Sequence, residues 1–217
     1  MRRRRFTLAL FGLALLASLT IGTLPVSGEG FLDLYAGAAF TRDADTTVTG
    51  IPFFLGEIQF DTGFVGGTRI GYWFEGAPWL GLALDGSWFR LDTDPSGGEV
   101  TVIPVSGLLM VRLPLGKNRD FPKGQVQPYF GIGPSAFISE LAAKLTPLGV
   151  PVRFSDTAVH AGLDARAGLA VLPHKNVGLF VEYRYTSFEP KWREHGSTVD
   201  IDMNTHHVVG GISFRFP

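Results

Sequence analysis

Residues 159–171 read Val-His-Ala-Gly-Leu-Asp-Ala-Arg-Ala-Gly-Leu-Ala-Val, and this stretch decides the fold. Every odd position in it is apolar, whereas every even position is small, polar or charged. Successive side chains of a β-strand point to opposite faces of a sheet, so this alternation predicts a strand with one apolar and one polar face. The polar face carries one acid and one base, Asp164 and Arg166.

The same alternation recurs along the chain. Residues 177–188 put apolar and aromatic side chains on one face and charged ones on the other, and residues 64–74 and 79–90 do the same. No segment after Glu29 is apolar over 18 residues, so no helix is expected to span a membrane there. Counting the alternating segments predicts eight strands, at roughly residues 31–40, 62–74, 79–90, 100–113, 126–138, 156–171, 177–188 and 201–216.

The composition of the two faces indicates which one points inward. A soluble barrel would present many Lys and Glu side chains on its polar face, but here that face is mostly Gly, Ala and Ser, with a few charges of both signs. The apolar face lacks charge over about 9–11 residues, the length of a transmembrane strand. A Lys or Arg facing the middle of the bilayer would cost about 2–4 kcal/mol. The sequence therefore predicts an all-β fold: a closed antiparallel up-and-down transmembrane β-barrel with its charges inside.

The connections between the predicted strands alternate in length. Long polar stretches follow the odd-numbered strands, at residues 41–61, 91–99, 139–155 and 189–200. Shorter turns follow the even-numbered strands, at residues 75–78, 114–125 and 173–176, although 114–125 is long for a turn. Outer-membrane barrels have long loops outside and short turns in the periplasm, so both termini are expected to be periplasmic. A short helix is predicted within the third long connection, from Ser139 to Leu148.

Aromatic side chains gather at the predicted strand ends and suggest the two girdles of a membrane barrel. The expected periplasmic girdle contains Tyr72, Phe74, Trp79, Tyr129 and Phe216, and the expected outer girdle contains Phe40, Trp88, Phe89, Phe137 and Trp192.

The N-terminal residues predict export. Arg2–Arg5 precede an apolar run that ends at Ala17, so residues 1–28 are expected to be a cleaved signal peptide and residues 29–217 the barrel domain. The chain has 19 Lys and Arg against 20 Asp and Glu, and the four arginines of the signal leave 15 against 20 in the barrel domain. This acidic balance argues against a nucleic-acid partner. The chain has no cysteine, which excludes a disulfide framework.

Four stretches resemble the porin-family outer-membrane β-barrel proteins, typified by the OmpA transmembrane domain and its small opacity-type relatives. They are residues 67–72 (Gly-Thr-Arg-Ile-Gly-Tyr), 127–133 (Gln-Pro-Tyr-Phe-Gly-Ile-Gly), 182–186 (Glu-Tyr-Arg-Tyr-Thr) and 209–216 (Val-Gly-Gly-Ile-Ser-Phe-Arg-Phe). The resemblance implies an eight-stranded monomer that is inserted from the periplasm by the barrel-assembly machinery and surrounded by lipid and lipopolysaccharide. It implies structural, adhesive or resistance-related surface roles rather than one activity. Pro217, after the terminal Phe216, departs from the family's usual ending.

The charges predicted to face inward are the first candidate site. An eight-stranded barrel has an interior just wide enough to be filled by side chains, so these charges should meet there. They could serve as a gate or a proton path, but mutual neutralisation in a closed interior is the favoured interpretation because an unpaired ion there would be costly. The expected network contains Arg69, Asp85, Asp164, Arg166, Glu182 and Arg184.

Enzymatic and metal sites find weaker support. Lipid A deacylases of similar size carry His-x-Ser-Asn on a late strand, but residues 183–188 contain no histidine, and His195-Gly-Ser197 lies in a predicted loop. His206 and His207 should point to opposite faces and cannot share a metal. No catalytic residue, cofactor or metal is therefore expected. Three acidic pairs near the outer rim could bind Ca²⁺ between lipopolysaccharide phosphates or could simply be hydrated: Asp43 and Asp45, Asp92 and Asp94, and Asp200 and Asp202.

These observations predict a non-enzymatic outer-membrane scaffold that presents four surface loops, whose ligand the sequence does not name. Two alternatives remain open: a transporter or narrow pore for small apolar solutes, and a lipid A-modifying enzyme.

Overall fold

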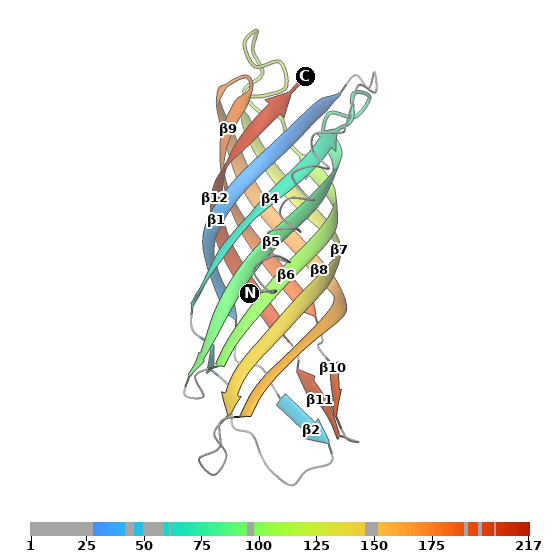
Figure 1. Cartoon of the computed structure of the whole chain (residues 1–217). Coiled ribbons are helices and arrows are strands. Elements are labelled where there is room, and N and C mark those ends of the chain that lie inside the picture. The colour runs from blue at the N-terminus through green and yellow to red at the C-terminus, as the bar shows by residue number, and fades with distance from the viewer. Residues whose placement is uncertain are drawn as a thin grey trace.

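The chain forms a barrel of tilted strands in a computed structural model (Figure 1). The model describes the backbone of residues 28–41, 46–49, 59–60, 62–94, 98–145, 152–188, 191–194, 197–201 and 203–217. Side chains are described for residues 28–41, 62–90, 101–139, 159–188 and 203–217. Within these ranges no helix is long and apolar enough to cross a membrane.

Eight long strands build the wall, and each pairs antiparallel with its neighbours in the order β5-β4-β1-β12-β9-β8-β7-β6. A further pairing of β5 with β6 closes the cylinder, so the predicted eight-stranded up-and-down barrel is confirmed. The strands are β1 (Glu29–Thr41), β4 (Gly63–Trp73), β5 (Leu80–Asp94), β6 (Gly98–Arg112), β7 (Val126–Leu145), β8 (Val152–His174), β9 (Val177–Phe188) and β12 (Met203–Phe216).

The first and last strands of the wall are neighbours. β1 and β12 pair from Gly30 opposite Phe216 to Thr41 opposite Thr205. Closure satisfies the backbone N–H and C=O groups that an open sheet would expose to lipid.

Short strands extend the barrel at the end opposite the C-terminus (Figure 1). β2 (Thr46–Thr49), β11 (Ser197–Ile201) and β10 (Lys191–Glu194) form a small three-stranded sheet, and β3 (Gln59–Phe60) pairs with the end of β5. All four segments fall in the connections expected at 41–61 and 189–200, except for Ile201, which falls in the strand expected at 201–216.

The helix predicted from Ser139 to Leu148 is wrong where the backbone is described. Residues 139–145 belong to β7 and pair with β8, from Ser139 opposite Ala158 to Leu145 opposite Val152. Pairing with a neighbouring strand gives these residues a hydrogen-bond ladder, which overrides the local preference for a helix.

The long turn at residues 114–125 contains several internal hydrogen bonds. A bridge between Leu115 and Val126 continues the β6–β7 pairing into it. The Asn118 side chain accepts hydrogen bonds from the backbone N–H groups of Asp120 and Phe121 at 2.9 and 2.8 Å. Gly116 adopts a φ of 65°, a conformation that glycine reaches without a steric penalty.

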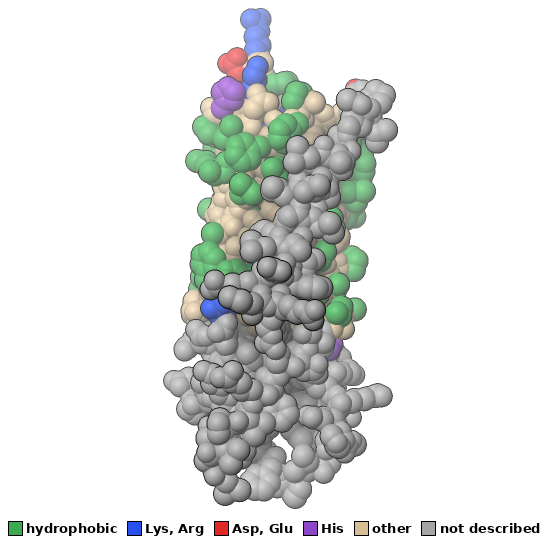
Figure 2. Space-filling model, in the orientation of Figure 1, with side chains coloured by type: hydrophobic (Ala, Val, Ile, Leu, Met, Phe, Trp, Pro, Cys, Tyr) green, Lys and Arg blue, Asp and Glu red, His purple; other side chains and the backbone are tan. Residues whose placement is uncertain are grey.

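The two faces of the wall are disposed as the alternation predicts. Val159 and Val181 on the outside are 67% and 62% exposed, whereas Asp164 and Arg166 on the inside are at most 1% exposed. Figure 2 shows patches of hydrophobic side chains on the wall, and exposed large apolar side chains occur on all eight wall strands. Such a surface suits lipid rather than water.

The predicted girdles need one correction. Trp79, Phe216 and Phe40 are exposed on the outside as expected, but Phe89 and Phe137 are fully buried inside the barrel. Tyr129 also points inward, where its hydroxyl donates to Glu182 at 2.9 Å. The reason is the alternation of side chains along a strand, here called parity: residues an even number of positions apart share a face. Phe89, Phe137 and Tyr129 therefore share the inward face with the buried Asp85, Ser135 and Gln127, respectively. Trp192 lies outside the described side chains.

Candidate functional site

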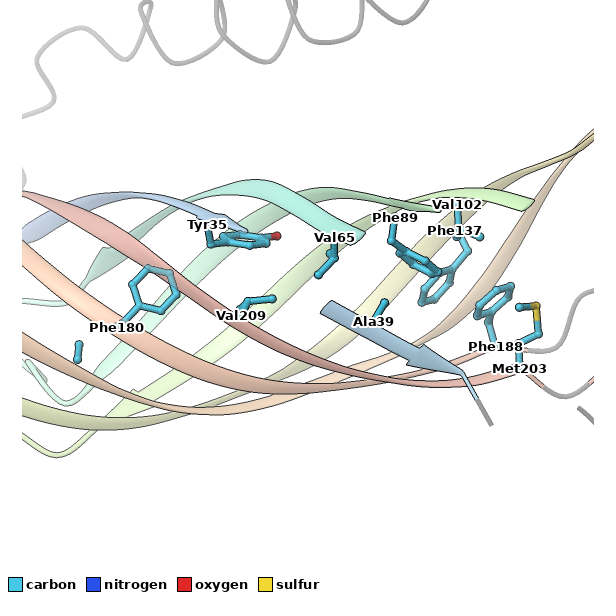
Figure 3. Packing of buried hydrophobic residues seen from close by; sticks show 11 residues of the cluster. Tyr35, Ala39, Val65, Phe89, Val102, Phe137, Phe180, Phe188, Met203 and Val209 are labelled. Carbon is cyan, nitrogen blue, oxygen red and sulfur yellow. The ribbon is translucent and has the colours of Figure 1, made fainter. Parts of the chain in front are cut away.

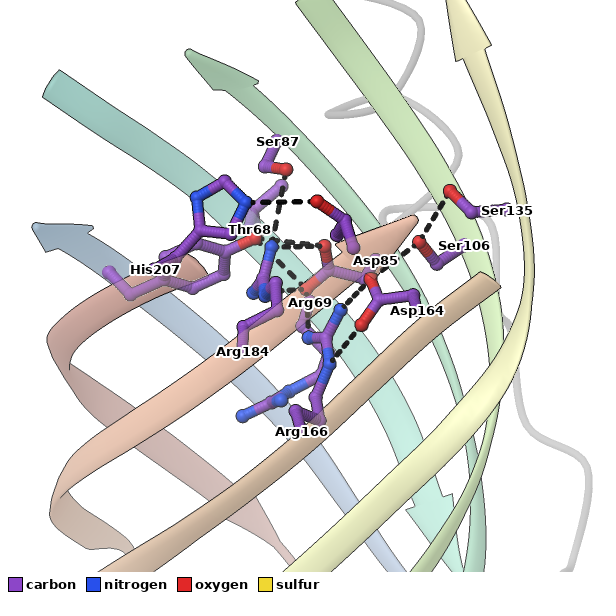
Figure 4. A network of polar contacts seen from close by, with 12 residues as sticks. Thr68, Arg69, Asp85, Ser87, Ser106, Ser135, Asp164, Arg166, Arg184 and His207 are labelled. Atoms are coloured by element: carbon purple, nitrogen blue, oxygen red, sulfur yellow. Dashed lines mark hydrogen bonds and ion pairs between the residues drawn. The ribbon is translucent and has the colours of Figure 1, made fainter. Parts of the chain in front are cut away.

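The interior of the barrel contains a connected network of charged side chains (Figure 4). The six residues predicted for it come from four strands and are all at most 2% exposed. β4 carries Arg69, β5 carries Asp85, β8 carries Asp164 and Arg166, and β9 carries Glu182 and Arg184. The structure brings all six together. Each side chain lies on the inward face of its strand, and the closed wall brings strands from different sides of the barrel within reach of one another.

Asp85 is the centre of one half of this network. Its carboxylate accepts hydrogen bonds from Arg166 at 2.8 Å, from Arg184 at 3.3 Å and from the Tyr35 hydroxyl at 2.9 Å. Arg166 also binds Asp164 at 2.5 Å, and the Ser106 hydroxyl donates to Asp164 at 2.8 Å. Each carboxylate in this half is therefore both paired and hydrogen-bonded, as a buried charge requires.

Arg69 organises the other half. Its Nη1 lies 2.5 Å from Glu182 Oε2, and its Nη2 lies 2.7 Å from Asp33 Oδ2. Glu182 also accepts from Arg184 at 3.2 Å, which joins the two halves. The Ser213 hydroxyl donates to the second oxygen of Asp33.

Four further buried charges were not predicted from the sequence: Asp33, and three residues at the end of the lumen nearer the C-terminus. Glu29 pairs there with Arg112 at 2.8 Å and with Arg215 at 3.7 Å. With these four the buried charges balance: five carboxylates face five guanidinium groups among the described side chains. Alternation along β1 could have found Asp33, because it shares one face of that strand with Phe31 and Tyr35, and all three are buried.

Aromatic and apolar layers close the lumen on both sides of the network. Toward the long connections, Phe137 and Phe188 stack with ring centroids 4.2 Å apart, and Phe89, Val65 and Ala39 pack with them (Figure 3). Buried apolar side chains of this layer leave little room for water.

Toward the C-terminal end, two arginines and two aromatic rings form a ladder. The Arg112 guanidinium lies 4.4 Å from the centroid of Trp73, Trp73 stacks on Phe31 at 5.5 Å, and Arg215 lies 5.1 Å from Phe31. A cavity of about 10 Å³ next to Arg69 and Arg215 has room for about one water molecule.

Metal and catalytic candidates are not assembled by the described residues. No group of three or more His, Asp or Glu side chains suited to a metal occurs among them. His207 is buried beside Thr186 and Phe89, whereas His206 faces outward and contacts Tyr183, so the predicted opposition of the two histidines is confirmed. The side chains of the three rim acid pairs, and His195-Gly-Ser197, fall outside the described side chains.

Geometry limits what this site can do. Its charges are bound to one another, and the cavity beside Arg69 has room for about one water molecule. A larger cavity, of about 430 Å³, lies at the C-terminal end of the barrel beside Glu29, Trp73 and Arg112. The arrangement can hold the wall in one shape and exclude solute.

Two solved structures share this fold at low sequence identity. Neisserial surface protein A aligns with a TM-score of 0.58 at 16% identity, covering 88% of this chain and 100% of that one. The outer membrane protein OprG from Pseudomonas aeruginosa aligns with a TM-score of 0.56 at 15% identity, covering 88% of this chain and 97% of that one. No curated protein matches the chain. Residues 11–216 match the family model of the outer membrane protein beta-barrel domain, and the chain therefore belongs to that family of outer-membrane β-barrels.

Proposed function

We propose that this protein is a non-enzymatic scaffold of the outer membrane, with a lumen closed to solutes and binding functions carried by its surface connections. The single observation that carries the proposal is the balanced set of five buried carboxylates and five guanidinium groups, which fills the lumen between the aromatic layer of Phe137 and Phe188 and the C-terminal end of the barrel. An open channel would leave such a set hydrated, whereas here the charges pair directly.

The energetics support a fixed plug rather than a gate. Opening the lumen would require several ion pairs to separate together, and a buried charge that loses its partner is strongly destabilising, by about 3–5 kcal/mol. Asp85, Glu182 and Arg69 each have two or more charged partners, so no single pair can swing away alone.

The orientation belongs to the proposal as well. The turns after β4, β6 and β8 lie at the end that carries the C-terminus, and the short strands β2, β3, β10 and β11 lie at the other end (Figure 1). Most of the connections expected at 91–99 and 139–155 is instead strand, because β5 pairs with β6 and β7 pairs with β8 there. The rule of short periplasmic turns and long outer loops supports periplasmic termini. Because the chain has no cysteine, single cysteines can test this without background. A cysteine at Lys175 should resist a membrane-impermeant maleimide in intact cells, and one at Asp94 should react.

Conductance in planar bilayers tests the closed lumen. The refolded protein should give no stable, large single-channel steps, and a general porin reconstituted in parallel provides the positive control. Stable steps would contradict the closed scaffold and favour the narrow-pore alternative.

Incubation with lipid A, followed by mass spectrometry, tests the absence of enzymatic activity: the lipid should be recovered unchanged.

A further inference from the structure

Four polar side chains lie together on the outward face of two neighbouring strands. They are Tyr183 and Tyr185 of β9 and Asn204 and His206 of β12, and we call them the polar patch. Each alternates along its strand with buried residues, and register places His206 directly opposite Tyr185. Tyr183 is 48% exposed. Outward positions nearer the C-terminal end of both strands are apolar or glycine, so the polar patch interrupts a lipid-facing surface.

Hydrogen bonds within the polar patch hold its side chains in place. The hydroxyl of Tyr183 lies 2.5 Å from Nδ1 of His206, and the hydroxyl of Tyr185 donates to Oδ1 of Asn204 at 2.7 Å. The rings of Tyr183 and Tyr185 lie 5.9 and 5.3 Å from the ring of His206, measured between centroids. Side chains that are already fixed lose little conformational freedom when they bind a ligand.

These internal hydrogen bonds leave donors unused. A tyrosine hydroxyl and a neutral imidazole each carry one hydrogen, so the pair of Tyr183 and His206 keeps one free donor whichever group donates to the other. Asn204 accepts through its oxygen and keeps its NH₂ group. Among the described residues, neither Nε2 of His206 nor Nδ2 of Asn204 has a hydrogen-bond partner. A donor without an acceptor is costly in apolar surroundings, so the polar patch needs acceptors from the membrane.

The depth of His206 indicates which acceptors it meets. Phe216 shares the outward face of β12 at its C-terminal end and is 53% exposed. The ten residues from Phe216 to His206 span about 34 Å along a strand, which at a tilt of about 40° is roughly 26 Å along the membrane normal. The apolar band of an outer-membrane barrel is about 25 Å tall. His206 therefore lies at the edge of this band, where acyl chains are linked to headgroups through carbonyl groups.

We propose that the polar patch binds the carbonyl oxygens of the acyl linkages of an outer-leaflet lipid. The ligand class is a multiply acylated glycolipid, whose ester and amide linkages offer several such oxygens. Asn204 and His206 are two residues apart, so their donors lie about 7 Å apart along β12 and can bind two linkages of one lipid. Phe40 of β1 lies opposite His206 and is exposed beside the acyl chains. Only the choice of leaflet rests on the orientation given under Proposed function.

Competition between two lipids, measured by native mass spectrometry of the refolded protein, tests this site. Mixed micelles contain equal amounts of ester-linked and ether-linked phosphatidylglycerol with the same chains, and only the ester-linked form has carbonyl groups. The wild type should retain the ester-linked form in at least about fivefold excess, as expected for one net hydrogen bond. His206→Phe keeps a ring but removes the donor, and should lower this ratio about fivefold. Asn204→Leu is a second, independent variant and should also lower it.

A second pair of probes tests the glycolipid. Bisphosphorylated lipid A and the same lipid without its phosphates both contain the acyl linkages, so the wild type should retain both. His206→Phe should reduce the retention of both forms about fivefold. A loss confined to the phosphorylated form would show that the polar patch recognises phosphate, and it would overturn the proposal.

Thr68→Val is the matched control. Thr68 occupies an outward position of β4, but its hydroxyl already donates to the backbone carbonyl of Asp33 at 3.1 Å, so the ratio should stay as in the wild type. Heat-modifiable gel mobility checks that each variant is folded. A wild-type ratio near one, or equal ratios in the wild type, His206→Phe and Asn204→Leu, would overturn the proposal. Failure of the scaffold itself would instead appear as channel steps, and a reversed orientation as reversed cysteine labelling; neither changes the preference for the ester-linked lipid.

Discussion

Arg69 of β4 reaches across the lumen to Glu182 of β9, with 2.5 Å between Nη1 and Oε2, although two other strands separate β4 from β9 in the wall. The two residues are 113 positions apart in the chain. This contact joins strands from two sides of the barrel. The side chains inside the barrel therefore help to hold the strands of the wall together.

Replacing Arg69 should therefore destabilise the barrel. Arg69→Met leaves Asp33 and Glu182 without a shared partner and should lower the free energy of unfolding by about 3–5 kcal/mol. Urea titration in lipid vesicles, followed by tryptophan fluorescence, measures this change. Lys175→Met is the control, because it removes an exposed cation from the turn between β8 and β9 and should change stability by about 0.5 kcal/mol or less. Equal effects of the two variants would show that the network contributes nothing.

A charge on the lipid face should be costly at mid-depth. Leu84 lies midway between Trp79 and Trp88 and is 56% exposed, so Leu84→Arg should destabilise the barrel by about 2–4 kcal/mol. Heat-modifiable gel mobility after refolding, together with urea titration, reports the loss. Leu84→Met keeps the apolar volume and should cost less than about 1.5 kcal/mol. If arginine is tolerated as well as methionine, the assignment of this face to lipid is wrong.

Two neighbouring glycines should respond oppositely to alanine. A Cβ on Gly133 of β7 would lie 1.8 Å from the carbonyl oxygen of Gly107 in β6, so Gly133→Ala must push the strands apart. We expect a loss of about 1–3 kcal/mol. A Cβ on Gly107 meets nothing within 4 Å, and Gly107→Ala should leave stability unchanged or slightly raised. Unfolding titrations of the pair check this, and similar losses would contradict the close packing.

The aromatic layer and the ionic network should close the lumen independently. Phe137 is fully buried and stacked on Phe188, so Phe137→Ala should cost about 3–5 kcal/mol. The same variant should remain without single-channel steps, because the charges below it still fill the lumen. Phe64→Ala removes a lipid-facing ring of the same size and serves as the control for stability. Channel steps in Phe137→Ala would show that the aromatic layer alone closes the barrel.

The strand faces could be predicted from sequence because a period of two is a local property. In residues 159–171 the pattern is unambiguous, and Asp164 and Arg166 lie inside as expected. Phe89 and Phe137 were assigned outward because they are aromatic residues near strand ends, although their parity with Asp85 and Ser135 already placed them inside. Alternation is the stronger rule, because the geometry of the strand backbone imposes it on every residue. A girdle reflects only the frequency of aromatic residues near strand ends.

The partners within the lumen could not be predicted in the same way. Which acid meets which base depends on the stagger of strands around the whole cylinder, and no local pattern records that stagger. Asp33 meets Arg69 across one strand boundary, but Arg69 meets Glu182 only because the wall closes. The small sheet of β2, β10 and β11 has the same origin, because its strands are short and polar and find each other only at the end of the finished barrel.

Pairing of β1 with β12 sets the timing of assembly. Until residues 203–216 have been made, β1 has no β12 with which to pair. A ribosome-bound or truncated chain therefore has two unpaired strand edges, and their free N–H and C=O groups keep it out of the hydrocarbon. The barrel can therefore enter the membrane only after the whole chain has been synthesised. The same adjacency means that a peptide linker could join the two ends and new termini could be cut at the tight β8–β9 turn, giving a permuted chain with the same wall.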